Sequence, residues 1–204
     1  MTSLNQKEDS SWQPIPTEAI VIENFNDASR ELFFQQLCQK VTLLTKELNL
    51  QMMSLQMSES GDIGIASIQY TPQDHPTGLG LIVLDSEIFI HQEAFTIDGV
   101  DNTDLIPITI EHEMTEVWVD LMNYYNDPSK KNYRLANGVA HKSGVMAEFA
   151  LAHKLGLADR YLDLVIRWAQ DMSWEQAQVF LEENFYAYQA TSYLANNSHS
   201  SIDD

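Results

Sequence analysis

The sequence predicts a single α+β domain, with a small antiparallel or mixed sheet in the N-terminal half packed on a set of C-terminal helices. Strand-like apolar runs are confined to residues 50–90, and helical periodicity dominates from Asp104 onward. Strands followed by helices favour this class over a doubly wound sheet, in which the two kinds of element alternate. The length of 204 residues and the apolar content of 44% allow one domain with a substantial core.

The two ends of the chain lack the apolar residues that a packed core requires. Residues 1–16 are polar and end with two closely spaced prolines, and residues 196–204 are similarly short of apolar groups. We therefore expect a flexible arm over residues 1–16, one domain over 17–195 and a flexible tail over 196–204.

The first half of the chain is predicted to contain one helix and three or four strands. A helix is expected from Asp27 to Leu48, because apolar residues recur near helical spacing and Asp27 can cap its start. Strands are expected at Leu50–Met57 and Ile63–Tyr70, joined by turn-forming residues 58–62. The apolar run Leu79–Ile90 predicts one or two more strands.

Four helices are predicted in the second half of the chain. They cover Asp104–Tyr125, Tyr133–Leu155, Asp159–Asp171 and Ser173–Leu194. Asp104 can cap a first turn that tolerates Pro107, and Gly156 suits a left-handed helix end. The last helix begins with a capping box, in which Ser173 and Gln176 satisfy each other's backbone N–H groups.

The composition excludes several classes of partner. Acidic residues outnumber basic ones by 30 to 11, giving a formal net charge of −19, which would repel nucleic acids and anionic membranes. No apolar run approaches the roughly 18 residues of a membrane span, and no secretory signal is visible. The one cysteine, Cys38, excludes an internal disulfide and is expected to be a small core residue. We expect a soluble, cytoplasmic protein.

A histidine and three glutamates are crowded together on the first helix of the second half. Residues 111–116 read Glu-His-Glu-Met-Thr-Glu and lie among apolar residues. His112 and Glu116 are four residues apart, so both side chains project from one helix face and can reach one ion. Imidazole nitrogen and carboxylate oxygen bind zinc at about 2.0–2.2 Å. A cation would also offset the cost of placing these polar groups in an apolar setting.

The following helix offers candidates for a third ligand. His141 and Glu148 are seven residues apart, or two turns, and therefore share a face. Alanines and a glycine make this helix slim, which would let it pack closely on its neighbour. We predict that His141 joins His112 and Glu116 as a metal ligand, with a fourth position open for water. Glu148 either replaces His141 or hydrogen-bonds a ligating imidazole from behind.

A second interpretation assigns these residues no chemistry. The three glutamates of residues 111–116 would then form a solvated acidic helix face, and His112 would be a half-buried histidine with ordinary partners. His141 and Glu148 would mark the polar edge of a core helix. The sequence does not specify whether the two helices bring His141 within reach of His112, so both interpretations stay open here.

Residues 110–120 resemble the active helix of the zincin metallopeptidases, which carries the motif His-Glu-x-x-His. The order of elements is also similar: strands first, then the active helix, then a helix with the third ligand. The resemblance implies a zincin-like fold with His112 as the first metal ligand and Glu113 as the general base. The family's sheet has an edge strand that lines the substrate cleft, and Leu79–Ile90 is the segment most similar to it in position.

The sequence departs from the family at the second ligand position, which holds Glu116 where the family has histidine. An anionic ligand makes the metal a weaker Lewis acid and its water less acidic. It also shifts the preference towards harder ions, so Mn²⁺ and Fe²⁺ are alternatives to Zn²⁺.

The leading functional expectation is a metal-dependent hydrolase acting on a peptide or protein substrate at a peptide or amide bond, with Glu113 taking a proton from water. The alternative is a non-catalytic metal-binding or acidic protein-interaction module on the same scaffold, which the charge and the altered ligand permit. A carboxylate-bridged di-metal bundle ranks last, because no Glu-x-x-His pair occurs on two helices. The sequence specifies neither the substrate nor the oligomeric state.

Overall fold

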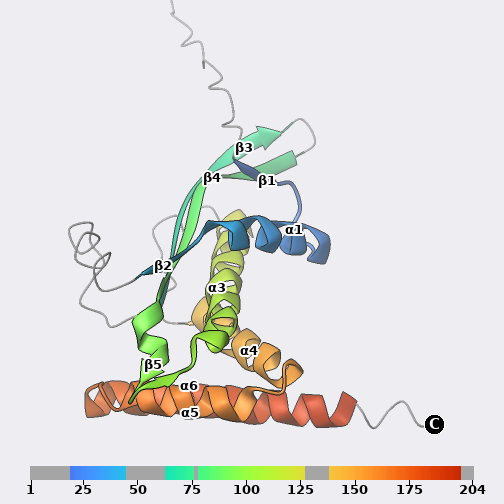
Figure 1. Cartoon of the computed structure of the whole chain (residues 1–204). Coiled ribbons are helices and arrows are strands. Elements are labelled where there is room, and N and C mark those ends of the chain that lie inside the picture. The colour runs from blue at the N-terminus through green and yellow to red at the C-terminus, as the bar shows by residue number, and fades with distance from the viewer. Residues whose placement is uncertain (1–18, 45–62, 76–77, 127–137, 199–204) are drawn as a thin grey trace, which may run out of the picture.

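The chain places its strands in the first half and all but one of its described α-helices in the second, which confirms the predicted α+β class. The structure is a computed structural model and describes residues 19–44, 63–75, 78–126 and 138–198. The sheet occupies one end of the molecule and most of the helices occupy the other, with helix α3 (Ile106–Asn126) running between them (Figure 1). This helix carries the residues of the predicted site.

The sheet is built around one long strand, β4 (Gly78–His91). Strand β3 (Gly64–His75) pairs antiparallel with it along the full length of both strands. On the other side of β4, β1 (Ile20–Ile22) pairs antiparallel and β2 (Val41–Leu44) pairs parallel. The sheet is therefore mixed, and β3 forms one of its edges within the described part of the chain.

The position of β4 corrects an expectation drawn from the zincin resemblance. Leu79–Ile90 was expected to match the edge strand beside the substrate cleft, but it forms the centre of the sheet. A strand of 14 residues is long enough to pair with β3 on one side and with two short strands on the other. Its inward-facing side chains, such as Leu81 and Ile88, are fully buried, as expected of a central strand.

The first helix, α1 (Asp27–Leu37), is much shorter than predicted. Its N-cap is Asn26, whose side chain accepts a hydrogen bond from the Ser29 N–H, and not Asp27. A 3₁₀ turn (Cys38–Lys40) ends the helix and leads into β2. The prediction that the helix continues was wrong up to Leu44, because the β-branched start of β2 favours a strand and pairing with β4 outweighs the local helical periodicity. The last part of the predicted helix, residues 45–48, lies outside the described residues.

The 3₁₀ turn also overturns the prediction that Cys38 is a core residue. Cys38 is exposed, and its Sγ lies 3.3 Å from Sδ of Met114 on α3. The helical periodicity that placed it inside ends one residue earlier, at Leu37, which is fully buried.

Several predicted segments fall partly or wholly outside the described residues. The expected strand Ile63–Tyr70 belongs to β3, but its hairpin partner is β4. The expected strand Leu50–Met57, the turn 58–62 and the arm 1–16 all lie outside the described residues. The predicted domain boundaries therefore remain predictions.

The remaining helices of the second half follow the predicted order. They are α4 (Val139–Lys154), α5 (Ala158–Ala169) and α6 (Trp174–Ser198). Gly156 has a φ of 71°, which confirms the left-handed end after α4. The Ser173–Gln176 capping box is also confirmed, with reciprocal N–H···O distances of 3.2 and 3.3 Å. Helix α6 continues through Ser198, beyond the predicted end at Leu194.

A short connection leads from β4 to α3. It contains a 3₁₀ turn (Gln92–Phe95), a two-stranded ribbon of β5 (Thr96–Ile97) and β6 (Val100–Asp101), and a second 3₁₀ turn (Thr103–Leu105). Asp104 was predicted to cap α3, but it lies inside this second turn. Its carboxylate instead accepts two hydrogen bonds from Arg160 of α5, at 2.6 and 2.8 Å.

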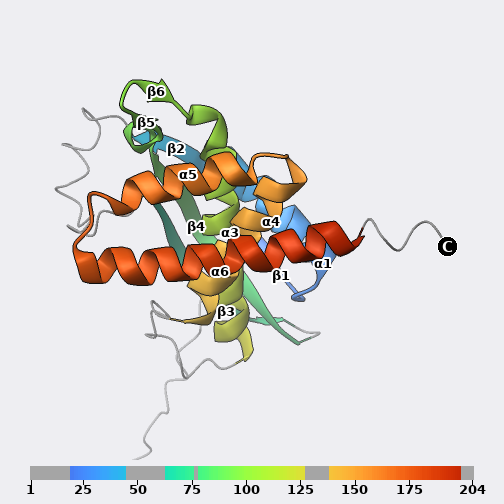
Figure 2. The same ribbon diagram turned by 90° about the horizontal axis from the view of Figure 1, so that it is seen from below.

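The core surrounds α3 on two sides. One part lies between α3, α1 and the sheet, where the rings of Phe33 and Trp118 are 5.7 Å apart. The other lies between α3, α4 and α5, where Phe149 packs edge-to-face on Tyr161 at 5.4 Å. Figure 2, the view from below, shows α6 lying across α4 and next to α5. Among the described helices, none combines the length and apolar character needed to cross a membrane.

Candidate metal centre

Helices α3 and α4 approach each other closely at a glycine. A Cβ atom at Gly144 of α4 would lie 2.9 Å from Cδ2 and 3.0 Å from Nε2 of His112 on α3. Real Cβ contacts are longer than this, so only a hydrogen fits between the α4 backbone and the imidazole ring. The slim character of this helix, expected from the sequence, therefore has a steric consequence: the missing side chain at Gly144 leaves room for the His112 ring between the helices.

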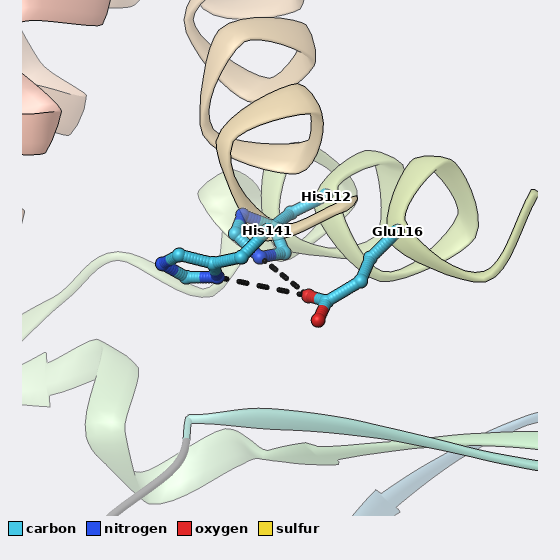
Figure 3. Close-up of side chains that lie close together, drawn as sticks. All are labelled: His112, Glu116 and His141. Carbon is cyan, nitrogen blue, oxygen red and sulfur yellow. Dashed lines mark hydrogen bonds and ion pairs between the residues drawn. The ribbon is translucent and has the colours of Figure 1, made fainter. Parts of the chain in front are cut away.

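Three potential ligands meet at this junction. His112 and Glu116 come from adjacent turns of α3, and His141 comes from the first turn of α4 (Figure 3). The Oε2 atom of Glu116 lies 3.2 Å from Nε2 of His112 and 3.7 Å from Nδ1 of His141. All three ligand atoms lie within 4.8 Å of one another. The structure thus brings together the three residues that the sequence singled out.

The spacing of these atoms fits a metal ion. Donors bound to a tetrahedral zinc ion at about 2.1 Å lie roughly 3.4 Å from each other. The two contacts of Glu116 bracket this value, and all three donor atoms lie within 4.8 Å of one another, so the side chains would have to draw closer together around an ion. Two imidazole nitrogens and one carboxylate oxygen also form a donor set found in catalytic zinc sites.

The carboxylate of Glu148 lies behind His112, on the side opposite to Glu116. Its Oε2 atom is 2.8 Å from Nδ1 of His112, and the Tyr161 hydroxyl donates to the same oxygen at 3.2 Å. Glu148 is only 4% exposed, and the Thr109 hydroxyl extends the hydrogen-bonded chain by contacting Tyr161 at 3.2 Å. Of the two roles left open for Glu148, the geometry favours that of a partner behind the imidazole.

The carboxylates and imidazoles of the cluster shift each other's pKa values. Burial alone would lower the pKa of His112, but the charge of Glu148 and hydrogen bonds to Glu116 and Glu148 raise it well above its usual value. A hydrogen bond to Glu116 raises the pKa of His141 despite partial burial. Burial opposes ionisation of Glu116, yet its two histidine partners lower its pKa to about 2. All three shifts favour positive charge on the imidazoles beside the Glu116 carboxylate, as expected of a site that could also hold a cation.

Glu113 lies one step round α3 and faces the start of β3. A Cβ atom at Gly64 would lie 2.6 Å from Oε1 of Glu113, so the carboxylate rests directly against the strand backbone. Glu113 is 9% exposed, and its charge acts on the nearby His112. The interpretation of Glu113 as part of a solvated acidic face was wrong, because α3 turns this side chain towards the sheet.

Glu111 belongs to a different face of α3. Its Oε1 atom lies 3.5 Å from Nη2 of Arg30 on α1, and burial raises its pKa. Of the three glutamates in residues 111–116, only Glu116 thus joins the cluster of potential ligands, and Glu113 lies beside it.

Two residues near the cluster were not anticipated from the sequence. Glu183 of α6 has its Oε2 atom 3.6 Å from Nε2 of His141, on the side of the ring that faces away from Glu116. Tyr161 of α5 is fully buried against Glu148. No local motif marks either residue, because each reaches the cluster only through the packing of helices that are distant in sequence.

Comparison of the chain with protein families, curated proteins and solved structures gives no match. The structure by itself supports an α+β fold with a His–Glu–His cluster that could bind a metal ion. The likeness to zincins continues to depend on the sequence motif alone.

We predict that Gly144→Ala weakens metal binding. The added methyl group would push against the His112 ring, which Glu148 holds from the other side. Overpacking of this kind costs about 1–3 kcal/mol, and the better helix propensity of alanine offsets about 1 kcal/mol of it. We expect the free energy of unfolding in urea to fall by about 1 kcal/mol and zinc affinity to fall at least tenfold. Unchanged zinc affinity would show that the close approach at Gly144 is irrelevant to the cluster.

A second prediction concerns Asp120, one turn after Glu116 on α3. Burial, followed by the charge of Glu116, raises the pKa of Asp120 from 3.8 to about 6. A raised carboxyl pKa means that the folded state binds the proton more tightly, so stability falls as pH rises from about 4 to 6. Asp120→Asn should remove this loss and stabilise the metal-free protein at pH 7 by about 1 kcal/mol, after allowance for solvent screening.

The measurement is urea unfolding of both proteins at pH 4 and pH 7 in the presence of a chelator. The gain from the substitution should appear at pH 7 and disappear at pH 4. An equal effect at both pH values would mean that the ionised carboxylate is not the cause.

Proposed function

We propose that this protein is a metal-dependent hydrolase of zincin type that cleaves a peptide or amide bond. His112, Glu116 and His141 would hold a zinc ion, and Glu113 would act as the general base. One observation carries the proposal: each imidazole directs one nitrogen at Glu116 and has a carboxylate behind its other nitrogen. Histidines that bind metals are commonly held in this way, since the second contact fixes the ring and its tautomer.

The chain's own residues would divide the chemistry among them. A zinc ion in this position supplies a Lewis acid that polarises a carbonyl group and makes water more acidic. Glu113 would accept the proton of the attacking water on its carboxylate and pass it to the leaving amine. Gly64 supports this role, because its missing side chain lets the Glu113 carboxylate lie between α3 and the start of β3.

The edge strand β3 offers a way to bind an extended substrate. Within the described residues, β3 pairs with β4 on one side only, and Gly64 at its start contacts Glu113. A peptide that pairs with an exposed sheet edge is held by main-chain hydrogen bonds whatever its side chains. A substrate strand added to β3 would therefore pass close to the proposed base. Mn²⁺ and Fe²⁺ remain alternatives to Zn²⁺, because Glu116 contributes a hard oxygen ligand.

The test is a comparison of metal binding and peptide cleavage in matched variants. We expect one zinc ion per chain in the wild type and none in His112→Ala or His141→Ala, measured by plasma mass spectrometry after chelator treatment and reloading. Glu113→Gln should keep the zinc but lose cleavage of a quenched-fluorescence peptide library by about 10²–10⁴-fold, the usual contribution of a general base.

His153→Ala is the matched control for these variants. His153 also lies on α4, but its Nε2 atom contacts Ser192 of α6 at 2.9 Å, away from the cluster. Its loss should leave zinc content and cleavage unchanged. Folded wild-type protein that takes up no zinc, manganese or iron would contradict the metal site, and metal-loaded protein that cleaves nothing would contradict the hydrolase.

An exposed aromatic face on α6 favours a second candidate, an acidic protein-interaction module. Trp174, Tyr186 and Tyr193 are 79%, 70% and 70% exposed. Aromatic side chains are enriched where proteins bind one another. Helix α6 contains no lysine or arginine, and Glu175 and Glu182 lie on the same face. A basic amphipathic helix of another protein would match both the apolar and the acidic character of this face.

We expect an 18-residue amphipathic peptide of leucine and lysine to bind the full chain more tightly than a scrambled peptide of the same composition. Trp174→Ser combined with Tyr186→Ser should weaken this binding at least tenfold in calorimetry, because the apolar contact is lost. Leu155→Ser, at an exposed apolar residue just after α4, is the control. Equal binding of the scrambled peptide would show that net charge alone causes the binding, which would contradict this candidate function.

A further inference from the structure

His141 lies between carboxylates from two different helices. Its Nδ1 atom is 3.7 Å from Oε2 of Glu116 on α3, and its Nε2 atom is 3.6 Å from Oε2 of Glu183 on α6. The other oxygen of Glu183 lies 4.0 Å from Nζ of Lys142. Three helices therefore contribute charge to the surroundings of this one imidazole.

The two histidines of the cluster differ in how firmly the structure holds them. His112 is buried between α3 and α4 and has a carboxylate at 2.8 Å behind it. The His141 side chain is 38% exposed and stands on the first turn of α4. Its ring meets the His112 ring edge-to-face at a centroid distance of 5.0 Å. His141 consequently depends more on its polar partners for a defined orientation.

A neutral imidazole can bind a metal only through the nitrogen that carries no proton. Nδ1 of His141 faces Glu116 and the metal position, so Nε2 must carry the proton for ligation to occur. An acceptor opposite Nε2 favours this tautomer, and Glu183 is the carboxylate at that position. A movement of less than about 1 Å in its side chain would bring it within normal hydrogen-bond distance.

We propose that Glu183 is a positioning residue for the metal site: it accepts the N–H of Nε2, leaves Nδ1 of His141 free for the metal, and turns the ring towards Glu116. This inference rests on the proposed metal site. Lys142 lies 4.0 Å from the other oxygen of the Glu183 carboxylate, so this side chain has a partner at each of its two oxygens. Helix α6 thereby becomes part of the metal centre, although it supplies no ligand.

The experiment measures zinc affinity by competition with a chromophoric chelator in the wild type and in Glu183→Leu, Glu183→Gln and Glu182→Gln. Loss of the carboxylate in Glu183→Leu should weaken zinc binding about 10–100-fold, the usual effect of removing such a partner. Glu183→Gln retains an acceptor oxygen and should lie in between. Glu182→Gln removes the same charge one residue earlier, at a side chain that contacts Gln178, and should bind zinc like the wild type.

A second readout is independent of metal. ¹⁵N-NMR of the histidine rings in the metal-free protein should show His141 mainly protonated on Nε2 at high pH in the wild type, and a shift towards the other tautomer in Glu183→Leu. The His112 signals should not change, because Glu148 holds that ring.

The outcomes separate this inference from the proposed function. If the wild type binds zinc and Glu183→Leu binds it equally well with unchanged His141 signals, the positioning role is overturned and the metal site stands. If the wild type itself binds no metal, the proposed function fails and the positioning role fails with it. Thermal melting of each variant distinguishes a local effect from unfolding.

Discussion

The close contact between α3 and α4 at Gly144 is the constraint on which the rest of the site depends. A side chain of any size at this position would separate the helices or displace the His112 ring. Because the helices approach so closely, His141 at the start of α4 comes within reach of Glu116 on α3, and Glu148 two turns later meets the far side of His112. One missing methyl group thus permits both the cluster of potential ligands and the support behind it.

Burying so many ionisable groups is stable only if their charges are compensated. Glu116 and Glu148 are carboxylates within a largely apolar setting, and the raised pKa of His112 and of His141 favours protons on the two imidazoles that balance them. A divalent cation can replace those protons, so metal uptake should release protons and depend on pH. The cluster therefore favours positive charge in the absence of a metal ion. Acidic side chains outnumber basic ones around the cluster, as they do in the whole chain.

The sequence predicted the parts of the site that depend on local geometry and missed those that depend on distant packing. His112 and Glu116 are neighbours by helical periodicity alone, and the choice of His141 followed from the slim character of its helix. Glu183 could not be found in this way, because its contact with His141 depends on how α4, α5 and α6 pack in three dimensions. The helical prediction failed at residues 41–44 for a related reason, since pairing with β4 determines their conformation.

The burial of Glu113 bears on the choice between an enzyme and a non-catalytic module. Glu113 is 9% exposed and lies against the backbone of Gly64, and burial of a carboxylate costs desolvation energy that its partners must offset. In the proposed mechanism this position keeps the Glu113 carboxylate beside the ligand cluster, where its charge acts on His112. The exposed aromatic face of α6 lies on a helix whose opposite side packs on α4. A partner bound to this face would therefore not block the proposed role of Glu113. The position of Glu113 is therefore compatible with the proposed role of general base, and that role does not depend on a partner of α6.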